Sequence, residues 1–257
     1  MNGSSLSVLG TPLQLCSYAS LIADLQARSR GEGTFAVDFT NTHIVTMRRR
    51  DPAFREVTSR FDYFIPDGMP LIWCLNRQGA KLRDRVYGPT FMRECVLGSP
   101  GPFTHYFLGG NDECVSRLKE FFLKQNPKIQ IIGARNGYFK AEDEAQIVEE
   151  INRLSPDFIW IGLGTPKQQA WIHKYKSQVR RGVLLAVGFA FDVNAGMKPD
   201  APLWMQRRGL TWVHRLSSEP RRLLMRYLRN NFWFLFYLFW DGLHGKAWAA
   251  EGETSKR

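Results

Sequence analysis

The sequence predicts an α/β fold with a mostly parallel sheet, followed by a helical C-terminal appendage. Short apolar runs alternate with amphipathic segments for about 200 residues, which is typical of parallel strands joined by helices. Several of these runs end in glycine, and after about Pro202 arginine and aromatic residues replace the alternation. We therefore expect a core over residues 1–202 and an appendage over residues 203–257, with length enough for one sizeable core.

Six strands and three helices are expected in the core. The strands are expected at Phe35–Phe39, Tyr63–Ile65, His105–Leu108, Ile129–Ile132, Phe158–Leu163 and Val183–Val187. The helices are expected at Glu113–Lys124, Glu142–Leu154 and Lys167–Val179. Four strands run into glycine, at Gly109-Gly110, Gly133, Gly164 and Gly188. Because glycine lets a ligand approach the backbone closely, this edge of the sheet is a candidate binding edge.

The turn at Gly164 is the most informative of these strand ends. Thr165 is expected to cap the following helix, with Pro166 in its first turn, where a missing N–H costs nothing. A helix that starts directly after a glycine turn points its N-terminus at solvent, where nucleotide phosphates commonly bind. Gln168 and Gln169 add side-chain amides for a base or a sugar. An ordinary strand-to-helix connection has the same pattern and stays an alternative.

The appendage combines arginine with aromatic residues. A helix is expected to start at Ser218-Glu219-Pro220, and it places Arg222, Arg226 and Arg229 on one face. The aromatic run Phe232–Trp240 follows and is too short to span a bilayer, which needs about 20 residues. An arginine face beside an aromatic block suits docking into an anionic membrane interface. Packing of the run on the core or in an oligomer interface is the alternative.

Composition indicates which kinds of binding partner and which cellular compartment to expect. Lys and Arg number 35 against 24 Asp and Glu, a net charge of +11, which favours nucleic acid, an anionic lipid surface or a phosphorylated substrate. Cys16, Cys74, Cys95 and Cys114 lie far apart and show no metal-ligand spacing, so we expect reduced thiols in a cytosolic protein. Residues 1–7 lack the features of a secretion signal.

Asp67 is the one carboxylate that stands out as a candidate catalytic group. It follows Ile65-Pro66 and precedes Gly68-Met69-Pro70, so it lies in a sharp turn at a strand end. There it can act as a general base toward the glycine edge, or it can simply bond its own backbone in an Asx-turn. No Asp-x-Asp, His-x-x-x-His or catalytic-triad motif occurs, so we expect no metal ion.

Ordered motifs over about residues 35–230 resemble one family. They are Ile65-Pro66-Asp67-Gly68, Arg85-Val86-Tyr87-Gly88-Pro89, Phe107 to Gly110, Gly137-Tyr138-Phe139, Pro156-Asp157, Gly162 to Trp171, Val187-Gly188, Phe191-Asp192, Ala195-Gly196, Ala201-Pro202 and Trp212 through Arg215 to Arg221. In this order they are similar to the WecG/TagA/CpsF glycosyltransferases, family 26. The resemblance implies a GT-E fold, a Rossmann-like core whose C-terminal appendage brings arginines over the active site.

The resemblance also implies the reaction. Family members transfer a sugar from a UDP-sugar to a polyprenyl-pyrophosphate-linked saccharide, inverting the anomeric carbon without a required metal or cofactor. Our best expectation is an N-acetylmannosamine-type donor, with a hexose or another N-acetylhexosamine left open, in bacterial envelope or exopolysaccharide synthesis. The chain would then be cytoplasmic and peripheral on the inner face of the membrane. The oligomeric state stays open, a homo-oligomer included.

Site residues follow from matching motifs. Asp67 is expected to be the general base that deprotonates the acceptor hydroxyl. The expected donor-binding residues are Asn41, Gly109, Gly110, Gly137, Tyr138, Gly164, Gln168 and Asp192. The expected pyrophosphate and acceptor residues are Arg85, Arg215, Arg221 and Arg226. Without a metal, cations must stabilise the charge that develops on the leaving UDP.

Three positions depart from the family pattern. Gln169 stands where members usually have Glu, Asp200 replaces the Arg of Arg-Ala-Pro, and Phe39-Thr40-Asn41 shifts the threonine of Thr-x-Asn. Two other functions stay open. A nucleic-acid-binding module would use the basic appendage, although nine contiguous apolar residues suit a nucleic-acid groove poorly. A nucleotide-sugar epimerase or dehydrogenase would need a G-x-G-x-x-G fingerprint that the N-terminal region lacks.

Overall fold

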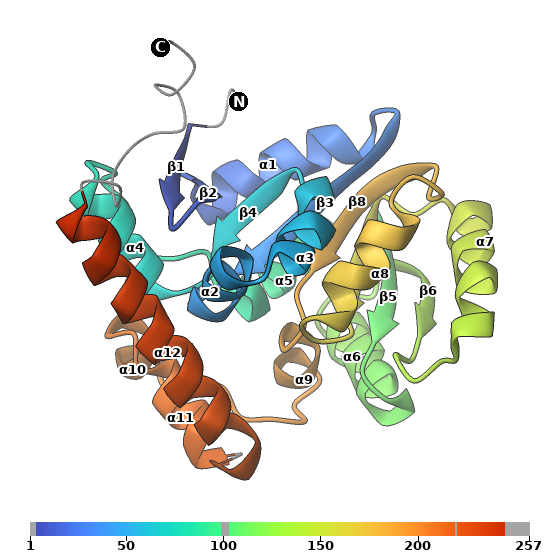
Figure 1. The fold of residues 1–257 in the computed structure, drawn as a ribbon. Coiled ribbons are helices and arrows are strands. Elements are labelled where there is room, and N and C mark those ends of the chain that lie inside the picture. The colour runs from blue at the N-terminus through green and yellow to red at the C-terminus, as the bar shows by residue number, and fades with distance from the viewer. Residues whose placement is uncertain (1–3, 99–102, 219, 245–257) are drawn as a thin grey trace, which may run out of the picture.

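A computed structural model describes residues 4–98, 103–218 and 220–244, except the side chains of residues 222, 223, 226 and 227. Its centre is an eight-stranded sheet with the order β1-β2-β4-β3-β8-β7-β5-β6 (Figure 1). All neighbouring strands are parallel except β1 and β2. The expected α/β class with a mostly parallel, Rossmann-like sheet is confirmed.

All six expected strands are present. They are β3 (Gly33–Thr40), β4 (Tyr63–Pro66), β5 (Thr104–Gly109), β6 (Gln130–Arg135), β7 (Phe158–Gly162) and β8 (Arg181–Ala186). Most strand bounds differ from those expected by one to three residues, and one difference changes the role of a glycine. β6 continues through Gly133, whose Cα faces the Tyr106 ring, so this glycine makes room for packing inside the strand. The central strands β7 and β8 are almost wholly buried because helices cover both faces.

A short hairpin at the N-terminus extends the sheet beyond the predicted strands. β1 (Ser5–Val8) and β2 (Thr11–Gln14) pair antiparallel and are joined by Leu9 and Gly10. Both turn residues have positive φ, 51° and 78°, as a tight hairpin turn requires. Four-residue strands carry little periodicity, and Leu9 is a poor turn signal, so this hairpin was not predicted.

Helices cover the two faces of the sheet. One face packs against α2 (Thr42–Arg50), α4 (Met69–Arg77), α7 (Glu144–Leu154) and α8 (Lys167–Tyr175). The other packs against α1 (Tyr18–Ser29), α5 (Gly88–Leu97), α6 (Asp112–Gln125) and α9 (Ala190–Asn194). The short α3 (Pro52–Val57), η1 (Thr58–Arg60) and η2 (Ala141–Asp143) complete the core.

The three predicted core helices are confirmed as α6, α7 and α8, with two corrections. α8 ends at Tyr175 and not at Val179. Its N-cap is Pro166, which makes no side-chain cap, so the expected capping role of Thr165 is wrong. The chain turns at Gly164 with φ 77°, and the Gln168 Oε1 accepts the Gly164 N–H at 3.2 Å. A side chain from within the helix therefore holds this turn.

The appendage consists of α10 (Leu203–Arg207), α11 (Thr211–Ser218) and α12 (Pro220–Leu243). A helix does begin at Pro220, but Ser218 ends α11, where its hydroxyl donates to the His214 carbonyl at 3.1 Å. The expected cap at Ser218 is therefore wrong, and Glu219 lies outside the described residues. Figure 1 shows α12 crossing in front of α11 and running toward the end of α4.

The aromatic run of α12 is divided between core and surface. Phe234 is 4% exposed and joins the core cluster on the α2 side of the sheet. Large apolar side chains on other faces of α12 are exposed, namely Leu228, Phe232, Leu235, Phe239, Trp240 and Leu243. Packing on the core is therefore confirmed for one face, and membrane docking of the other stays a prediction. No helix of the described residues is long and apolar enough to cross a bilayer.

Candidate active site

A cleft of about 1260 Å³ opens at the carboxyl ends of the parallel strands. Its floor is formed by the segments that follow β4, β5, β7 and β8, the edge where open α/β sheets bind ligands. α12 supplies part of the opposite wall through Asn230, Phe234 and Leu238. The cleft is thus bounded by both the core and the appendage.

Asp67 lies in this cleft directly after β4. Its backbone N–H donates to the Thr40 carbonyl at 2.7 Å, which continues the β3–β4 pairing and fixes the turn. One carboxylate oxygen accepts the Gly88 N–H at 3.2 Å. Burial raises the pKa of Asp67 to about 7, although Arg85, the Gly88 hydrogen bond and Arg215 each lower it. The contact to Gly88 is not that of a local Asx-turn, and a carboxyl with this pKa suits general-base catalysis.

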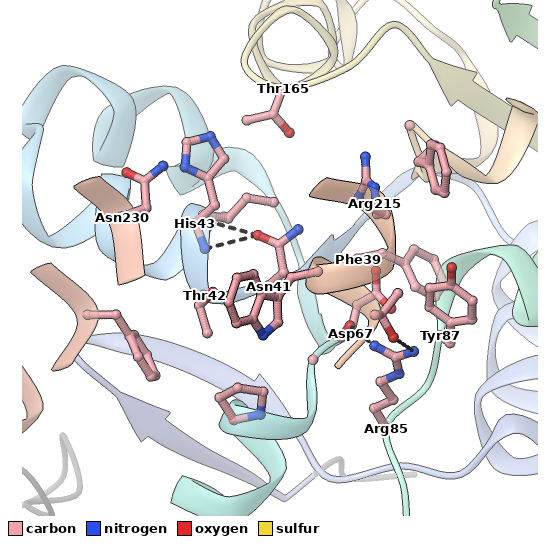
Figure 2. A pocket seen from close by; sticks show the side chains of 18 of the residues that line it. Phe39, Asn41, Thr42, His43, Asp67, Arg85, Tyr87, Thr165, Arg215 and Asn230 are labelled. Atoms are coloured by element: carbon pink, nitrogen blue, oxygen red, sulfur yellow. Dashed lines mark hydrogen bonds between the residues drawn. The ribbon is translucent and has the colours of Figure 1, made fainter. Parts of the chain in front are cut away.

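Arg85 lies below Asp67 and holds its turn in place (Figure 2). Its Nη1 donates to the Asp67 carbonyl oxygen at 3.4 Å, and its Nη2 donates to Thr211 Oγ1 at 2.9 Å. The guanidinium also lies 4.2 Å from the centre of the Tyr87 ring. Because Thr211 starts α11, this one arginine ties the appendage to the turn that carries Asp67.

Arg215 approaches the same carboxylate from the appendage. Its guanidinium lies 3.9 Å from the centre of the Phe189 ring, and its charge lowers the pKa of Asp67. Arg221 is exposed and does not line the cleft. The side chain of Arg226 lies outside the described residues. Of the two predicted arginines of α11 and α12 that are described, the structure brings only Arg215 to Asp67.

Some glycines of the predicted binding edge line the cleft, and another serves the packing of neighbouring strands. Gly164 faces open space, and Gly110 and Gly137 line the cleft, joined by a 2.8 Å hydrogen bond from the Gly137 N–H. Gly109 does not line it: a Cβ there would lie 2.6 Å from the backbone of Gly162 on the neighbouring strand. Gly109 therefore permits the close approach of β5 to β7.

Other predicted donor residues also line the cleft. Tyr138 stands at the rim with 83% of its surface exposed. Asp192 follows the turn after β8 and pairs with Lys198 at 3.3 Å. Asn41 caps α2, because its Oδ1 accepts the N–H groups of His43 and Ile44. Its NH2 end is therefore the part available to a ligand.

The two glutamines of α8 have different surroundings. Gln168 lines the cleft while its Oε1 holds the Gly164 turn. Gln169 is fully buried, and its Nε2 donates to Asp38 at 2.7 Å. Asp38 also accepts from Thr40 Oγ1, and burial raises its pKa to about 6. A carboxylate at 169 would face the Asp38 carboxylate, so the departure at this position suits its neighbour in this chain.

The other departures have structural explanations as well. Asp200 accepts a 2.8 Å hydrogen bond from the Tyr87 hydroxyl and a 3.2 Å hydrogen bond from Gln206. It therefore connects α5 to α10 and does not project into the cleft as a free acid. Phe39 lines the cleft and packs on Phe91, with ring centres 4.9 Å apart.

The cleft contains residues that the sequence analysis missed. They are His43, Lys167, Phe189, Lys198, Thr211 and Asn230. Lys167 follows the quoted Thr165-Pro166 pair and could have been included from that motif, whereas nothing in the local sequence marks Asn230, which lies between the arginines and the aromatic run. Within the described residues no group of three or more His, Cys, Asp or Glu side chains could hold a metal ion.

Comparisons with known proteins match most of the chain to one family. The family model described as "Glycosyl transferase WecG/TagA/CpsF family" matches residues 6–247. Curated relatives include the N-acetylglucosaminyldiphosphoundecaprenol N-acetyl-beta-D-mannosaminyltransferases of two Staphylococcus aureus strains. The MW2 protein is 24% identical over 225 residues, and the MRSA252 protein is 25% identical over 224. Each match covers 86% of this chain and 88% of the relative.

Proposed function

The chain belongs to the WecG/TagA/CpsF family of glycosyltransferases, and from this premise we propose the reaction that it catalyses. The donor is a UDP-sugar, with an N-acetylmannosamine-type sugar as the best candidate and a hexose or another N-acetylhexosamine as the alternative. The acceptor is a polyprenyl-diphosphate-linked saccharide of bacterial envelope or exopolysaccharide synthesis. The Staphylococcus aureus relatives are named as transferases that act on N-acetylglucosaminyldiphosphoundecaprenol, which supports this choice of acceptor.

The observation that carries the proposal is the position of Asp67. It combines a raised pKa of about 7 with two neighbouring arginines, in a cleft that reaches both the glycine edge and the appendage. A carboxylate of higher pKa is a stronger base, and at neutral pH a large fraction of it is still ionised. A base that removes a proton from a sugar hydroxyl needs both properties.

The chemical step is a single displacement. The acceptor hydroxyl gives its proton to the Asp67 carboxylate, while its oxygen forms a bond to the anomeric carbon of the donor. The bond between that carbon and the UDP oxygen breaks, and the electron pair leaves with UDP. Attack opposite the leaving group inverts the anomeric configuration.

Cations of the cleft are suited to the leaving diphosphate. Arg215, Lys198 and Lys167 all line it, and Gly164 presents open backbone at the start of α8. Positioned cations stabilise charge that develops in the transition state. We propose that these side chains serve in place of a metal ion, and the reaction as written uses no cofactor.

The acceptor lipid fits the apolar end of the cleft. Trp73 and Met69 of α4 line it together with Phe234, Leu235 and Leu238 of α12. Further apolar side chains of α12 are exposed beyond this end of the cleft, and the protein carries a net charge of +11. We propose that this surface sits on the anionic inner face of the cytoplasmic membrane and that the prenyl chain enters the cleft there.

A donor screen tests the proposed function. Purified protein is mixed with a short-chain prenyl-diphosphate N-acetylglucosamine and a panel of UDP-sugars, with EDTA present, and UDP release is measured. Acceptor-dependent release with one donor is expected, and Asp67→Asn should abolish it while UDP binding persists. Activity that requires added divalent metal would refute the metal-free mechanism, and full activity of Asp67→Asn would refute the assignment of the base.

A further inference from the structure

Asn230 carries a buried polar group without a partner in the described part of the chain. Its side chain is 4% exposed, and its Nδ2 makes no hydrogen bond. Buried amide groups are nearly always hydrogen-bonded, so each exception calls for an explanation such as a ligand. Asn230 also lines the cleft that holds Asp67.

The wall around Asn230 offers neutral hydrogen-bonding groups. Figure 2 shows its amide nitrogen directed toward His43, with Asn41 and Thr42 close to that histidine at the start of α2. All four residues line the cleft. The Asn41 oxygen is engaged in capping α2, so Asn41 presents a second NH2 group.

Arg85 and Arg215 lie on a different side of the cleft from this wall. In Figure 2, Arg85, Arg215 and Tyr87 lie on the Asp67 side, whereas Asn230 and His43 lie away from them. Diphosphates favour the arginine side, because charge-assisted hydrogen bonds are stronger than neutral ones. Amides and hydroxyls match the hydroxyl and acetamido groups of an uncharged sugar ring, and the nearby Trp73 and Phe234 add apolar surface.

The wall is held in position by contacts between α2 and α12. Arg49 pairs with Asp241 at 3.0 Å, and the Arg50 guanidinium lies 4.3 Å from the centre of a Trp233 ring. Both contacts lie on the C-terminal side of Asn230 along α12, and they hold this helix against α2. The amide is therefore fixed before a ligand arrives, which lowers the entropic cost of binding.

We propose that Asn230 binds the sugar of the lipid-linked acceptor, with its Nδ2 donating to a sugar oxygen. The inference rests on the proposed function and adds a specificity-determining residue supplied by the appendage. The acceptor sugar is favoured over the donor sugar because α12 also forms the apolar end of the cleft, whereas the glycine edge that suits the donor lies on β5, β7 and β8.

The experiment compares two soluble probes by calorimetry. One is an N-acetylglucosaminyl diphosphate with a short alkyl chain, and the other is the same alkyl diphosphate without the sugar. Asn230→Ala should bind the sugar-bearing probe about tenfold more weakly and the sugar-free probe as the unchanged protein does. Asn230→Asp, which keeps the shape but loses the NH2 donor, should show the same selective loss. Gln146→Ala, an exposed amide on α7, is the matched control.

The outcomes separate a ligand role from a structural one. Removing an unpaired buried amide should leave the melting temperature of Asn230→Ala unchanged or higher. Equal weakening of both probes, or of neither, overturns the proposal. In turnover assays the KM for acceptor should rise about tenfold, with the KM for donor unchanged. If the unchanged protein turns over no donor but the selective loss in binding remains, the proposed function fails while the sugar site stands.

Discussion

At the residue scale, Asp67 shows how burial changes the acidity of a common side chain. The carboxylate accepts one backbone N–H and has two arginines nearby, yet the loss of solvent outweighs both effects and raises its pKa to about 7. The sequence marked this aspartate by its turn between prolines. The burial that raises the pKa arises in a cleft walled partly by Thr211 and Arg215, which are distant from Asp67 in the chain.

The raised pKa predicts the pH dependence of the reaction. A general base must be deprotonated, so kcat/KM should increase with pH and level off above about pH 7, where Asp67 is ionised in the free enzyme. The measurement is kcat/KM for the acceptor across about three pH units centred on neutrality. A profile that stays flat across the range, or one that falls, would rule out Asp67 as the base.

Substitution of Asp38 is expected to change the stability of the folded protein and not the catalysed reaction. Its folded-state pKa of about 6 lies above the ordinary 3.8, so ionisation of Asp38 removes stability as pH rises through about 6. Asn at this position can donate to the buried Gln169 Oε1, which has no partner among the described residues. Asp38→Asn should therefore stabilise the protein by about 1 to 3 kcal/mol at pH 8 and by about half as much at pH 5, which lies between the unfolded and folded pKa values.

Urea unfolding at the two pH values measures this difference. Asp62→Asn is an informative comparison, because Asp62 pairs with Lys176 at 2.6 Å near the surface and should lose a little stability. Destabilisation by Asp38→Asn at pH 8 would show that the ionised carboxylate is preferred at this position.

At the element scale, the docking of α12 depends on a few contacts with α2. Asp241 is buried and pairs with Arg49, and Phe234 is packed in the core cluster. Asp241 is the buried member of this pair and Arg49 the exposed one, so loss of the Asp241 carboxylate removes a polar contact that ties α12 to α2. The helix is otherwise rich in exposed apolar side chains, so these contacts decide whether it covers the cleft.

Asp241→Ala should therefore loosen α12 without unfolding the core. We expect amide exchange of α12 to accelerate about tenfold or more, with β7 unchanged, because local and global opening are separate events. Hydrogen exchange followed by mass spectrometry measures both segments. Arg117→Ala, which breaks an exposed pair with Glu113 on α6, is the control. Equal acceleration in α12 and β7 would mean that the appendage and the core open together.

At the scale of the whole molecule, a strongly basic chain exposes large apolar side chains along one helix. The net charge is +11, and α12 exposes Leu235, Phe239, Trp240 and Leu243. Anionic lipid attracts such a surface by both electrostatic and hydrophobic terms. The boundary between residues 202 and 203 remains a prediction, since Thr211 and Phe234 are buried where the two parts meet.

Vesicle flotation tests this surface. Binding to vesicles with about one-third anionic lipid should exceed binding to neutral vesicles and fall as salt rises, and Phe239→Ser with Trp240→Ser should weaken it severalfold. Tyr138→Ser, another exposed aromatic residue at the cleft rim, should leave vesicle binding unchanged. Salt-sensitive binding to oligonucleotides without binding to anionic vesicles would favour the nucleic-acid alternative.

The sequence by itself determined the α/β class, the six strands β3 to β8, the glycine turn at 164 and the position of Asp67 in a turn after a strand. These features have local signals, because hydrophobic period, glycine and proline act over a few residues. Only the tertiary structure decided which of those residues face the cleft. It placed Gly110 at the cleft but Gly109 against β7, and it paired Gln169 with Asp38. It also brought Asn230 and Thr211 from the appendage to the wall of the cleft. Burial and partners arise from contacts between segments far apart in the chain, and a local pattern carries no record of them.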